Sequence, residues 1–340
     1  MAIESPDPAI SEADADARMK ARRDDIVATL AKADHRILAR DYRGAAAFYG
    51  AVGRLAMGGA ELDHAELLRA RDTAAWLDAR FGEMLRDGLA KAGLGEGQRH
   101  PRLQTALELM RGERRREPET SRYPQQPQTF FYPEMPLAEF VDPTDFEWRA
   151  GIEAQTATIL AEAEVLLTDP ANFLPYMRQT TDRPQGDVHG LLENPDWSTC
   201  YLTDQGQPIA ERVALAPVTY GELNSTVPLC RIGKRAPSIM FSMLRAQSNI
   251  PSHTGMVNCR FVCHLPLIVP DNCGFRVGHT TRDWRVGELM VFDDSVQHEA
   301  WNNSDKDRLV LIFDIWRPDV SIEERRQIET LFNIVDGVEG

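Results

Sequence analysis

The chain has 340 residues, of which 43% are hydrophobic and 26% charged, the composition of an ordinary folded protein long enough for more than one domain. Its formal net charge of −14 argues against non-specific nucleic-acid binding, because such binding needs clustered cations that displace counterions from phosphates. No apolar run approaches the roughly eighteen residues that a membrane-spanning helix requires. We therefore expect a peptide, protein or small-molecule substrate rather than a nucleic acid.

Cysteine usage and the start of the chain indicate a compartment. The number of cysteines is odd and no Cys-x-x-Cys pair occurs, so the chain does not resemble a small disulfide-stapled protein. Cys259 and Cys263 are better interpreted as small buried hydrophobic residues. The first twenty residues are polar and rich in alanine and acids, without the apolar core of a signal peptide. We expect a cytoplasmic protein.

Residues 1–16 have the composition of a disordered acidic leader. From residue 17 to residue 111 apolar residues recur at three- and four-residue spacing, which predicts helices. The stretch 41–46 resembles a helix start of a tetratricopeptide unit, but no second copy follows 34 residues later, so a repeat array is not supported. We interpret residues 17–111 as a helical, possibly tetratricopeptide-like, annex to the main domain.

Residues 112–144 contain several prolines around the aromatic run Phe130-Phe131-Tyr132, which predicts a connection that clings to the next domain. Residues 145–340 then begin with a helix and continue as many short strands separated by polar turns, among them 196–202, 239–244 and 308–316, the pattern of a sandwich or jelly roll. Ser321 and Glu324 form a capping box that opens a C-terminal helix reaching about Ile334. The predicted fold class is α+β, a jelly-roll domain preceded by helices.

Alternation along two predicted strands points to a polar cavity. Between residues 258 and 264, Arg260, Val262 and His264 share one strand face, whereas the other face is apolar. Arg308 begins the strand 308–316, which is apolar on both faces and hence predicted to be buried. A buried arginine is costly unless it meets an anion. The anion can be a protein carboxylate or the carboxylate of a ligand, and the sequence leaves both open.

His253, at the predicted entry to a strand, and His298 bracket these strands, and Arg308 follows His298 by ten residues. Two histidines and a carboxylate are the usual ligands of non-haem iron. A His-x-Asp/Glu motif would need an acid at position 255, where the chain has Gly255. Either a water completes the site, or Asp293, Asp294 or another acid reaches it, or no metal binds.

From Asp196 to Pro318 the chain resembles the aspartyl/asparaginyl β-hydroxylases. The resemblance is carried by several blocks in combination: His253-Thr254-Gly255, Asn258-Cys259-Arg260 with His264-Leu265, Cys273-Gly274 with Arg276, Phe292-Asp293-Asp294-Ser295 with His298-Glu299 and Trp301, and Arg308 with Asp314, Trp316 and Pro318. It implies a double-stranded β-helix, or jelly roll, that uses Fe(II), O2 and 2-oxoglutarate. This family binds iron through two histidines without a protein carboxylate, so a glycine at 255 is expected.

By position, the resemblance implies that His253 and His298 are the catalytic iron ligands. Arg308 and Ser242 then hold the distal carboxylate of 2-oxoglutarate, and His264 lies at its iron-proximal end. The full set of implied cosubstrate contacts is Ser242, Leu244, Arg260, His264, Arg308 and Val310. The chain departs from the animal enzymes at Val262, where they carry a further arginine, and at Thr203, where they carry a tryptophan.

The function implied is hydroxylation of aspartyl or asparaginyl residues, or of a related substrate, with release of succinate and CO2. The alternatives are an oxygenase that acts on a lipid or a small metabolite, and a catalytically silent jelly roll that serves as a binding or scaffold domain. The helical region is a candidate for binding a protein partner, since family members recruit substrates through helical repeats.

Overall fold

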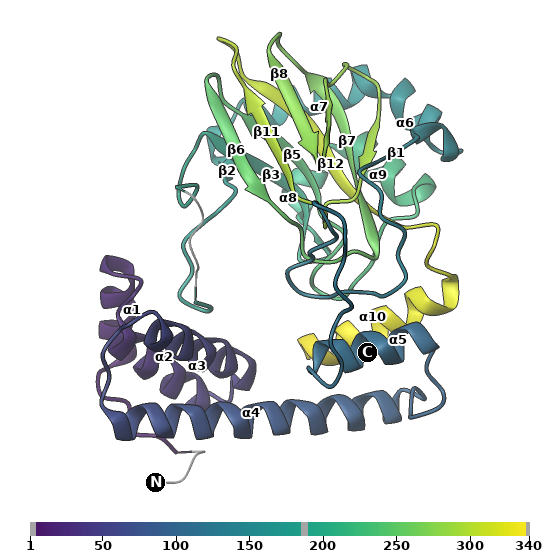
Figure 1. The fold of residues 1–340 in the computed structure, drawn as a ribbon. Coiled ribbons are helices and arrows are strands. Elements are labelled where there is room, and N and C mark those ends of the chain that lie inside the picture. The colour runs from purple at the N-terminus through teal and green to yellow at the C-terminus, as the bar shows by residue number, and fades with distance from the viewer. Residues whose placement is uncertain (1–4, 185–189, 338–340) are drawn as a thin grey trace. The chain divides into compact units, whose positions relative to one another are not determined.

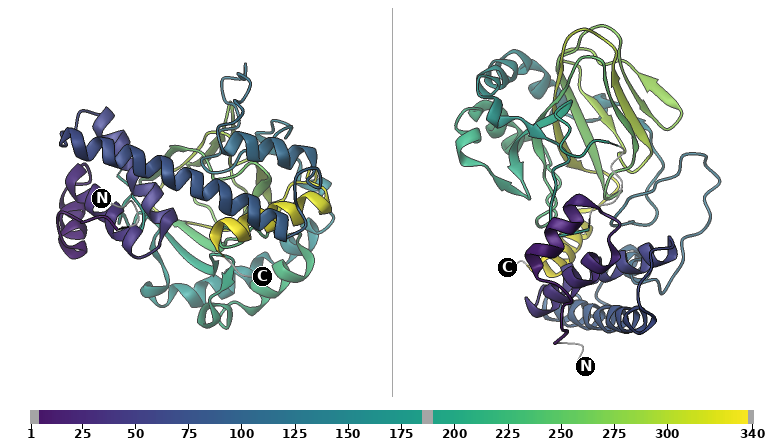
Figure 2. Two further views of the ribbon diagram at one scale, coloured as in Figure 1. Left: turned by 90° about the horizontal axis from the view of Figure 1, so that it is seen from below. Right: turned by 90° about the vertical axis from the view of Figure 1, so that its left-hand side faces the viewer.

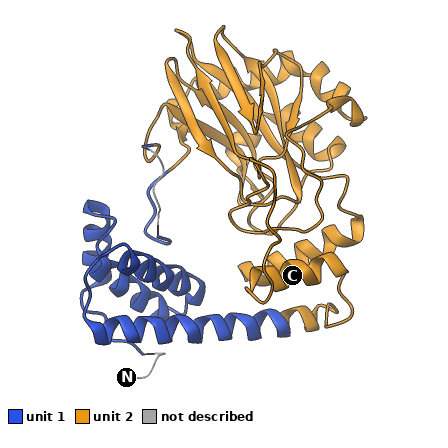
Figure 3. Cartoon of the chain, in the orientation of Figure 1, with its two compact units in different colours: residues 1–87, 178–190 blue, residues 88–177, 191–340 orange. Residues whose placement is uncertain are grey.

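The computed structural model describes residues 5–184 and 190–337. The chain divides into two compact units, residues 1–87 with 178–190 and residues 88–177 with 191–340 (Figure 3). The division falls inside α4 (His64–Lys91), whereas composition alone places a boundary at residue 112. None of the helices in the described ranges combines the length and the apolar character needed to cross a membrane.

The first unit is built from α1 (Glu12–Ala21), α2 (Ile26–Leu38), α3 (Tyr42–Met57) and most of α4. Helix α1 begins within the stretch expected to be disordered, because Ser11 caps it by accepting a hydrogen bond from the backbone N–H of Asp14. The buried ammonium of Lys32 lies 2.8 Å from Glu12 and 2.6 Å from Asp16, which holds α1 against α2. Residues 12–16 of the expected disordered leader are therefore helical, and its residues 1–4 lie outside the described residues.

A buried carboxylate organises the packing of α2, α3 and α4 in this unit. Asp34 accepts two hydrogen bonds from the guanidinium of Arg69, at 2.8 and 2.9 Å, and one from the hydroxyl of Tyr49. Burying an acid is tolerated here because a cation and a hydroxyl satisfy it. Residues 178–184 also pack on this unit, where Arg183 forms an ion pair with Asp41, the N-cap of α3, at 3.0 Å.

The second unit is a jelly roll (Figure 1). Its larger sheet has the strand order β1-β10-β7-β12-β5-β3-β2, and its smaller sheet the order β6-β11-β8-β9. From β5 onward, successive strands pass mostly from one sheet to the other, which is the winding of a double-stranded β-helix. The strands are β1 (Phe140–Val141), β2 (Leu174–Pro175), β3 (Trp197–Asp204), β4 (Gln207–Pro208), β5 (Ile239–Leu244), β6 (Ser248–His253), β7 (Arg260–Ile268), β8 (Cys273–Val277), β9 (Thr280–Arg282), β10 (Met290–Phe292), β11 (His298–Asn302) and β12 (Arg308–Trp316).

The larger sheet is covered by helices on one face and by the smaller sheet on the other (Figure 2). Along β12, Leu309, Leu311 and Phe313 pack on the helical side, whereas Val310 and Ile312 face the smaller sheet. Strands buried on both faces explain the apolar runs in the sequence. The helices of this unit are α5 (Pro101–Met110), α6 (Arg149–Ala154), α7 (Thr156–Leu167), α8 (Ala210–Val213), α9 (Pro217–Thr226) and α10 (Ile322–Asp336), with 3-10 turns at Pro143–Asp145 and Pro170–Asn172.

The predicted α+β jelly-roll class is confirmed, and so are the strands expected at 196–202, 239–244 and 308–316. The predicted capping box of Ser321 and Glu324 opens α10. Strand β6 was not expected, and it corrects the position of His253, which ends a strand instead of entering one. The five cysteines are buried and form no disulfide, and Cys263 packs in the core as predicted.

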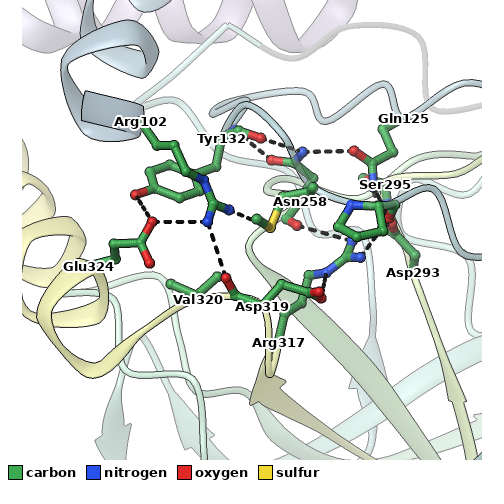
Figure 4. Close-up of polar contacts among 12 residues, drawn as sticks. Arg102, Gln125, Tyr132, Asn258, Asp293, Ser295, Arg317, Asp319, Val320 and Glu324 are labelled. Carbon is green, nitrogen blue, oxygen red and sulfur yellow. Dashed lines mark hydrogen bonds and ion pairs between the residues drawn. The ribbon is translucent and has the colours of Figure 1, made fainter. Parts of the chain in front are cut away.

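The proline-rich connection is pinned to the jelly roll by buried polar groups (Figure 4). Asn258 donates to Gln125 and to the carbonyl of Tyr132, each at 2.9 Å, and accepts from the N–H of Tyr132 at 2.6 Å. Gln125 in turn donates to Asp293, which forms an ion pair with Arg317 at 2.9 Å. These contacts agree with the expectation that the aromatic run clings to the domain.

Candidate active site

Two histidines lie side by side at the adjacent ends of two paired strands of the smaller sheet. His253 is the last residue of β6 and His298 the first of β11, and the two are directly paired across the strands. Their ring centroids are 4.2 Å apart. Four strands, β7 to β10, separate His253 from His298 in the sequence, and the pairing of β6 with β11 brings the two histidines together.

Backbone carbonyls fix the orientation of both rings. His253 Nδ1 lies 2.8 Å from the carbonyl of Pro251, and His298 Nδ1 lies 2.9 Å from the carbonyl of Val296. A carbonyl oxygen can only accept, so each Nδ1 carries the proton and each Nε2 carries the lone pair. Burial and the neighbouring His253 lower the pKa of His298 to about 3, so its ring is neutral at physiological pH. Two neutral imidazoles with their lone pairs on Nε2 suit a divalent transition metal.

The space beside Gly255, where the side chain of a ligand acid would begin, is occupied by the carboxylate of Asp294. A Cβ added to Gly255 would lie 1.9 Å from Oδ2 of Asp294, so a side chain larger than hydrogen does not fit at residue 255. Asp294 is held by Arg260 through this oxygen at 2.8 Å, and its Oδ1 is buried without a partner. Asp293 is bound instead by Ser295, Gln125 and Arg317. Across the described part of the chain, no group of three histidine, cysteine or acidic side chains is arranged to hold a metal.

Arg308 is a buried cation at the start of β12. Its exposed fraction is 1%, and within residues 5–184 and 190–337 it forms no ion pair. Its Nη2 donates a hydrogen bond of 3.5 Å to the hydroxyl of Ser242, and its Nε has no acceptor among the described residues. Burial lowers the pKa of Arg308 to about 10, which reflects the cost of a charge without a counterion. None of the described carboxylates is the protein partner that the sequence left open for Arg308.

Ser242, Leu244 and Val310 lie beside Arg308 on the interior face of the larger sheet. Leu244 is paired with Arg308, and Val310 with Ser242, between β5 and β12. Ser242 accepts a hydrogen bond from the indole N–H of Trp197 at 3.2 Å. These three predicted cosubstrate residues therefore form one continuous wall with Arg308, two apolar side chains beside a hydroxyl and a guanidinium.

His264 lies on β7 next to these residues, also facing the interior. Its ring packs against Phe292 at 4.9 Å and against Phe275 at 5.2 Å, and its Nδ1 is buried without a partner. Burial, and then the charge of Arg308, lower the pKa of His264 well below its ordinary value, so the ring is neutral. Val262 lies on the same face, within the apolar cluster between the sheets.

Arg260 has protein partners that the sequence did not indicate. Its guanidinium lies 2.8 Å from Asp294 and 2.9 Å from Asp314. Both carboxylates neutralise the guanidinium. Arg260 shares the interior strand face with Val262 and His264, as alternation predicts, but its charge is bound by Asp294, the acid beside Gly255. Its assignment to cosubstrate binding stays a prediction.

Two aromatic residues at the site were missed. Tyr176 stacks on Trp197, with ring centroids 3.9 Å apart, and Trp197 lies 6.1 Å from His253. Trp197 thus bridges the histidine pair and Ser242. Its place on a predicted strand was a usable signal, but Tyr176 follows the very short β2 and nothing in the local sequence marks it. Thr203, on the same strand as Trp197, is buried, and its hydroxyl has no hydrogen-bond partner within residues 5–184 and 190–337.

The part of the chain that resembles a known protein family contains the strands β2 to β12 of the jelly roll. The aspartyl/asparaginyl beta-hydroxylase family matches residues 153–318. The aspartyl/asparaginyl beta-hydroxylase of Mus musculus is 34% identical over 144 residues, which cover 42% of this chain and 19% of the mouse protein. The ornithine lipid ester-linked acyl 2-hydroxylase of Rhizobium tropici is 30% identical over 180 residues, covering 52% of this chain and 60% of that protein.

A solved prolyl-4-hydroxylase from Pseudomonas putida is 16% identical and covers 50% of this chain and 99% of its own, with a TM-score of 0.29. This chain spans less than two thirds of both curated relatives. The matched segment includes both histidines, Arg308 and every strand of the smaller sheet. Residues 153–318, just under half of the chain, are thus similar to the aspartyl/asparaginyl β-hydroxylase family.

Proposed function

We propose that this protein is a hydroxylase that depends on Fe(II) and 2-oxoglutarate. The observation that carries the proposal is Arg308, a buried guanidinium without an anionic partner in the described part of the chain, which lies in the same jelly-roll interior as the histidine pair. A buried cation of this kind destabilises the fold unless a ligand brings the counterion. A dicarboxylate satisfies this need, because one end can neutralise Arg308 while the other reaches toward the metal.

The histidine pair fits the metal. His253 and His298 present Nε2 lone pairs from paired strands, and carbonyl acceptors hold the tautomer of each ring. Bound Fe(II), together with 2-oxoglutarate and O2, would supply the oxidising chemistry that hydroxylates a C–H bond, with succinate and CO2 as coproducts. The protein contributes two ligands only, which leaves the remaining positions for the cosubstrate, O2 and water.

The interior residues hold and shield the cosubstrate. Arg308 and Ser242 bind the distal carboxylate, and Leu244 and Val310 line its path. Apolar side chains exclude water there, which strengthens the attraction between guanidinium and carboxylate. His264 is neutral, so it can hydrogen-bond to the cosubstrate without adding a second positive charge next to the metal. Arg260 neutralises Asp294, which keeps that acid beside Gly255.

For the substrate, we propose an aspartyl or asparaginyl residue of a peptide or protein, in line with the family name and the mouse relative. A lipid acyl chain is the second candidate, because the Rhizobium relative is named as an acyl 2-hydroxylase and matches a larger share of this chain. Succinate release with aspartyl or asparaginyl peptides and with acyl lipids, followed by the mass of the product, decides between these substrates.

Anaerobic titration tests the cofactors. Fe(II) and 2-oxoglutarate added without oxygen should give the wild type a weak visible metal-to-ligand band. His298→Ala should abolish the band, whereas His279→Ala, which removes an exposed histidine of the same unit, should leave it intact. Arg308→Met should shift the band to much higher 2-oxoglutarate concentrations. A wild-type protein that shows neither the band nor succinate release would be the silent jelly roll, and the proposal would be wrong.

A further inference from the structure

A tryptophan that the sequence did not single out lies against Arg308. Trp284, in the segment between β9 and β10, has an exposed fraction of 4%. Its ring stacks on Phe275, with centroids 5.3 Å apart and planes at 19°. The guanidinium carbon of Arg308 lies 4.8 Å from the ring centroid of Trp284. The indole face therefore contacts the cation that we assign to the distal carboxylate.

The indole N–H of Trp284 is a buried hydrogen-bond donor. Its Nε1 is buried and lacks a partner among the described residues, as does Nε of Arg308. An indole nitrogen can only donate, and a buried donor left unpaired costs about 1–3 kcal/mol. Trp197, the other interior tryptophan, donates to Ser242 at 3.2 Å. The contrast between the two indoles indicates that the donor of Trp284 meets a group that arrives from outside the protein.

The other arginine of this interior face is already bound. Arg260 is neutralised by Asp294 and Asp314, and position 262 carries a valine. Arg308 is thus the guanidinium left to meet an anion on this face in the described chain, and it has one long contact with Ser242. Two unmet N–H donors next to an unneutralised charge are complementary to an anion with two acceptor oxygens, such as a carboxylate.

We propose that Trp284 is a cosubstrate-binding residue: its indole N–H donates to the distal carboxylate of 2-oxoglutarate, and its ring face orients Arg308 for the same carboxylate. This inference rests on the proposed function, because it needs a dicarboxylate in the interior. It adds a neutral donor to a site in which a single arginine carries the charge. Trp284 acts on binding at the far end of the cosubstrate, through its contact with Arg308.

Trp284→Phe tests the inference, because it removes the N–H and keeps an aromatic face over Arg308. Calorimetric titration with Mn(II), which replaces iron without turnover, measures the affinity for 2-oxoglutarate directly. We expect the Kd for 2-oxoglutarate to rise about tenfold, since a hydrogen bond to a charged group is lost. The Kd for 2-oxopentanoate, which has the keto-acid end and lacks the distal carboxylate, should change by less than about twofold.

Controls separate this inference from the proposed function. Trp148→Phe removes an indole on the helical side of the larger sheet and should leave both affinities unchanged. Unchanged binding of 2-oxopentanoate by Trp284→Phe shows that the variant is folded. Equal 2-oxoglutarate affinity in wild type and Trp284→Phe, or an equal loss for both keto acids, overturns the role of Trp284 alone. Failure of the Mn(II)-loaded wild type to bind 2-oxoglutarate overturns the proposed function itself.

Discussion

At the scale of single residues, the site is defined as much by a missing side chain as by those present. Gly255 stands where a ligand acid would be expected after His253, and the carboxylate of Asp294 fills the space beside its Cα. Asp294 cannot swing away freely, because it is buried and bound to Arg260. The glycine is therefore required by packing, whichever group completes the metal coordination.

Gly255→Ala tests this packing requirement. The new methyl group would overlap Asp294, so we expect the free energy of unfolding to fall by about 2 kcal/mol. Displacement of Asp294 should also weaken Mn(II) binding about tenfold, because a group that supports the metal site moves. Denaturant unfolding and metal titration measure the two effects.

Gly151→Ala is the matched control, because a Cβ at Gly151 in α6 meets nothing within 4 Å. That variant should keep both stability and metal affinity. If Gly255→Ala behaves like Gly151→Ala, Asp294 is free to move and does not support the site.

At the scale of elements, the N-cap residue of helix α2, Asp25, also binds a side chain of helix α1. Asp25 caps α2 by accepting from the N–H of Ala28 at 3.0 Å, and it accepts from two nitrogens of Arg18 on α1, at 2.8 and 3.0 Å. Burial raises the pKa of Asp25, but the hydrogen bonds from Ala28 and Arg18 outweigh it, so the net pKa lies below the ordinary value of 3.8. The ionised carboxylate is thus the form that stabilises the helical unit.

The sign of this shift predicts a pH dependence. A carboxyl whose pKa is lower in the folded state contributes stability that is present above pH 3.8 and is lost as the pH falls through the folded-state pKa. Asp25→Ala should destabilise the helical unit by about 1 kcal/mol at pH 7, through loss of the cap. The difference from wild type should narrow below about pH 4.

Asp25→Asn is the informative comparison, because asparagine retains a capping oxygen but no charge. It should lose less stability at pH 7 than Asp25→Ala and show a flatter pH profile than wild type. Helicity followed during denaturant unfolding at several pH values measures these differences. A wild-type advantage that persists unchanged to pH 2 would contradict the lowered pKa.

At the scale of the whole molecule, the residues proposed to hold the metal and the cosubstrate all belong to one of the two compact units. The histidine pair, Arg308 and the interior wall all belong to residues 88–177 and 191–340. Ligands that bind the folded state stabilise it by mass action, by about 2.7 kcal/mol at one hundred times Kd. We therefore expect ligand binding to stabilise the strands that carry the site more than the rest of the chain.

Amide hydrogen exchange with and without Mn(II) tests this localisation. Metal should slow exchange in β6 and β11, whose paired ends carry His253 and His298, and chelation should reverse the effect. Adding 2-oxoglutarate to the metal-loaded protein should extend protection to β5 and the start of β12. Helices α1 to α3 should change little. Equal protection in His298→Ala would show that the metal binds elsewhere.

The sequence by itself determined the class of the fold and most of the interior face. Alternation along β7 is a local property of an extended chain, so it placed Val262 and His264 on one strand face, and in the structure both lie on the interior face of the larger sheet. The capping box of α10 is equally local. The motif blocks supplied the family, and the residues themselves pointed to a histidine pair near a buried arginine.

Only the tertiary structure decided what these side chains meet. The partners of Arg260, Asp294 and Asp314, are 34 and 54 positions away, and no local pattern encodes such pairing. Strand β6 reads as a polar loop, because its neighbours, and not its composition, make it a strand. Trp284 lies in a segment without regular structure, and only its packing on Phe275 brings it to Arg308. Local periodicity fixes which way a side chain points, whereas long-range packing decides its partner and whether its charge is met.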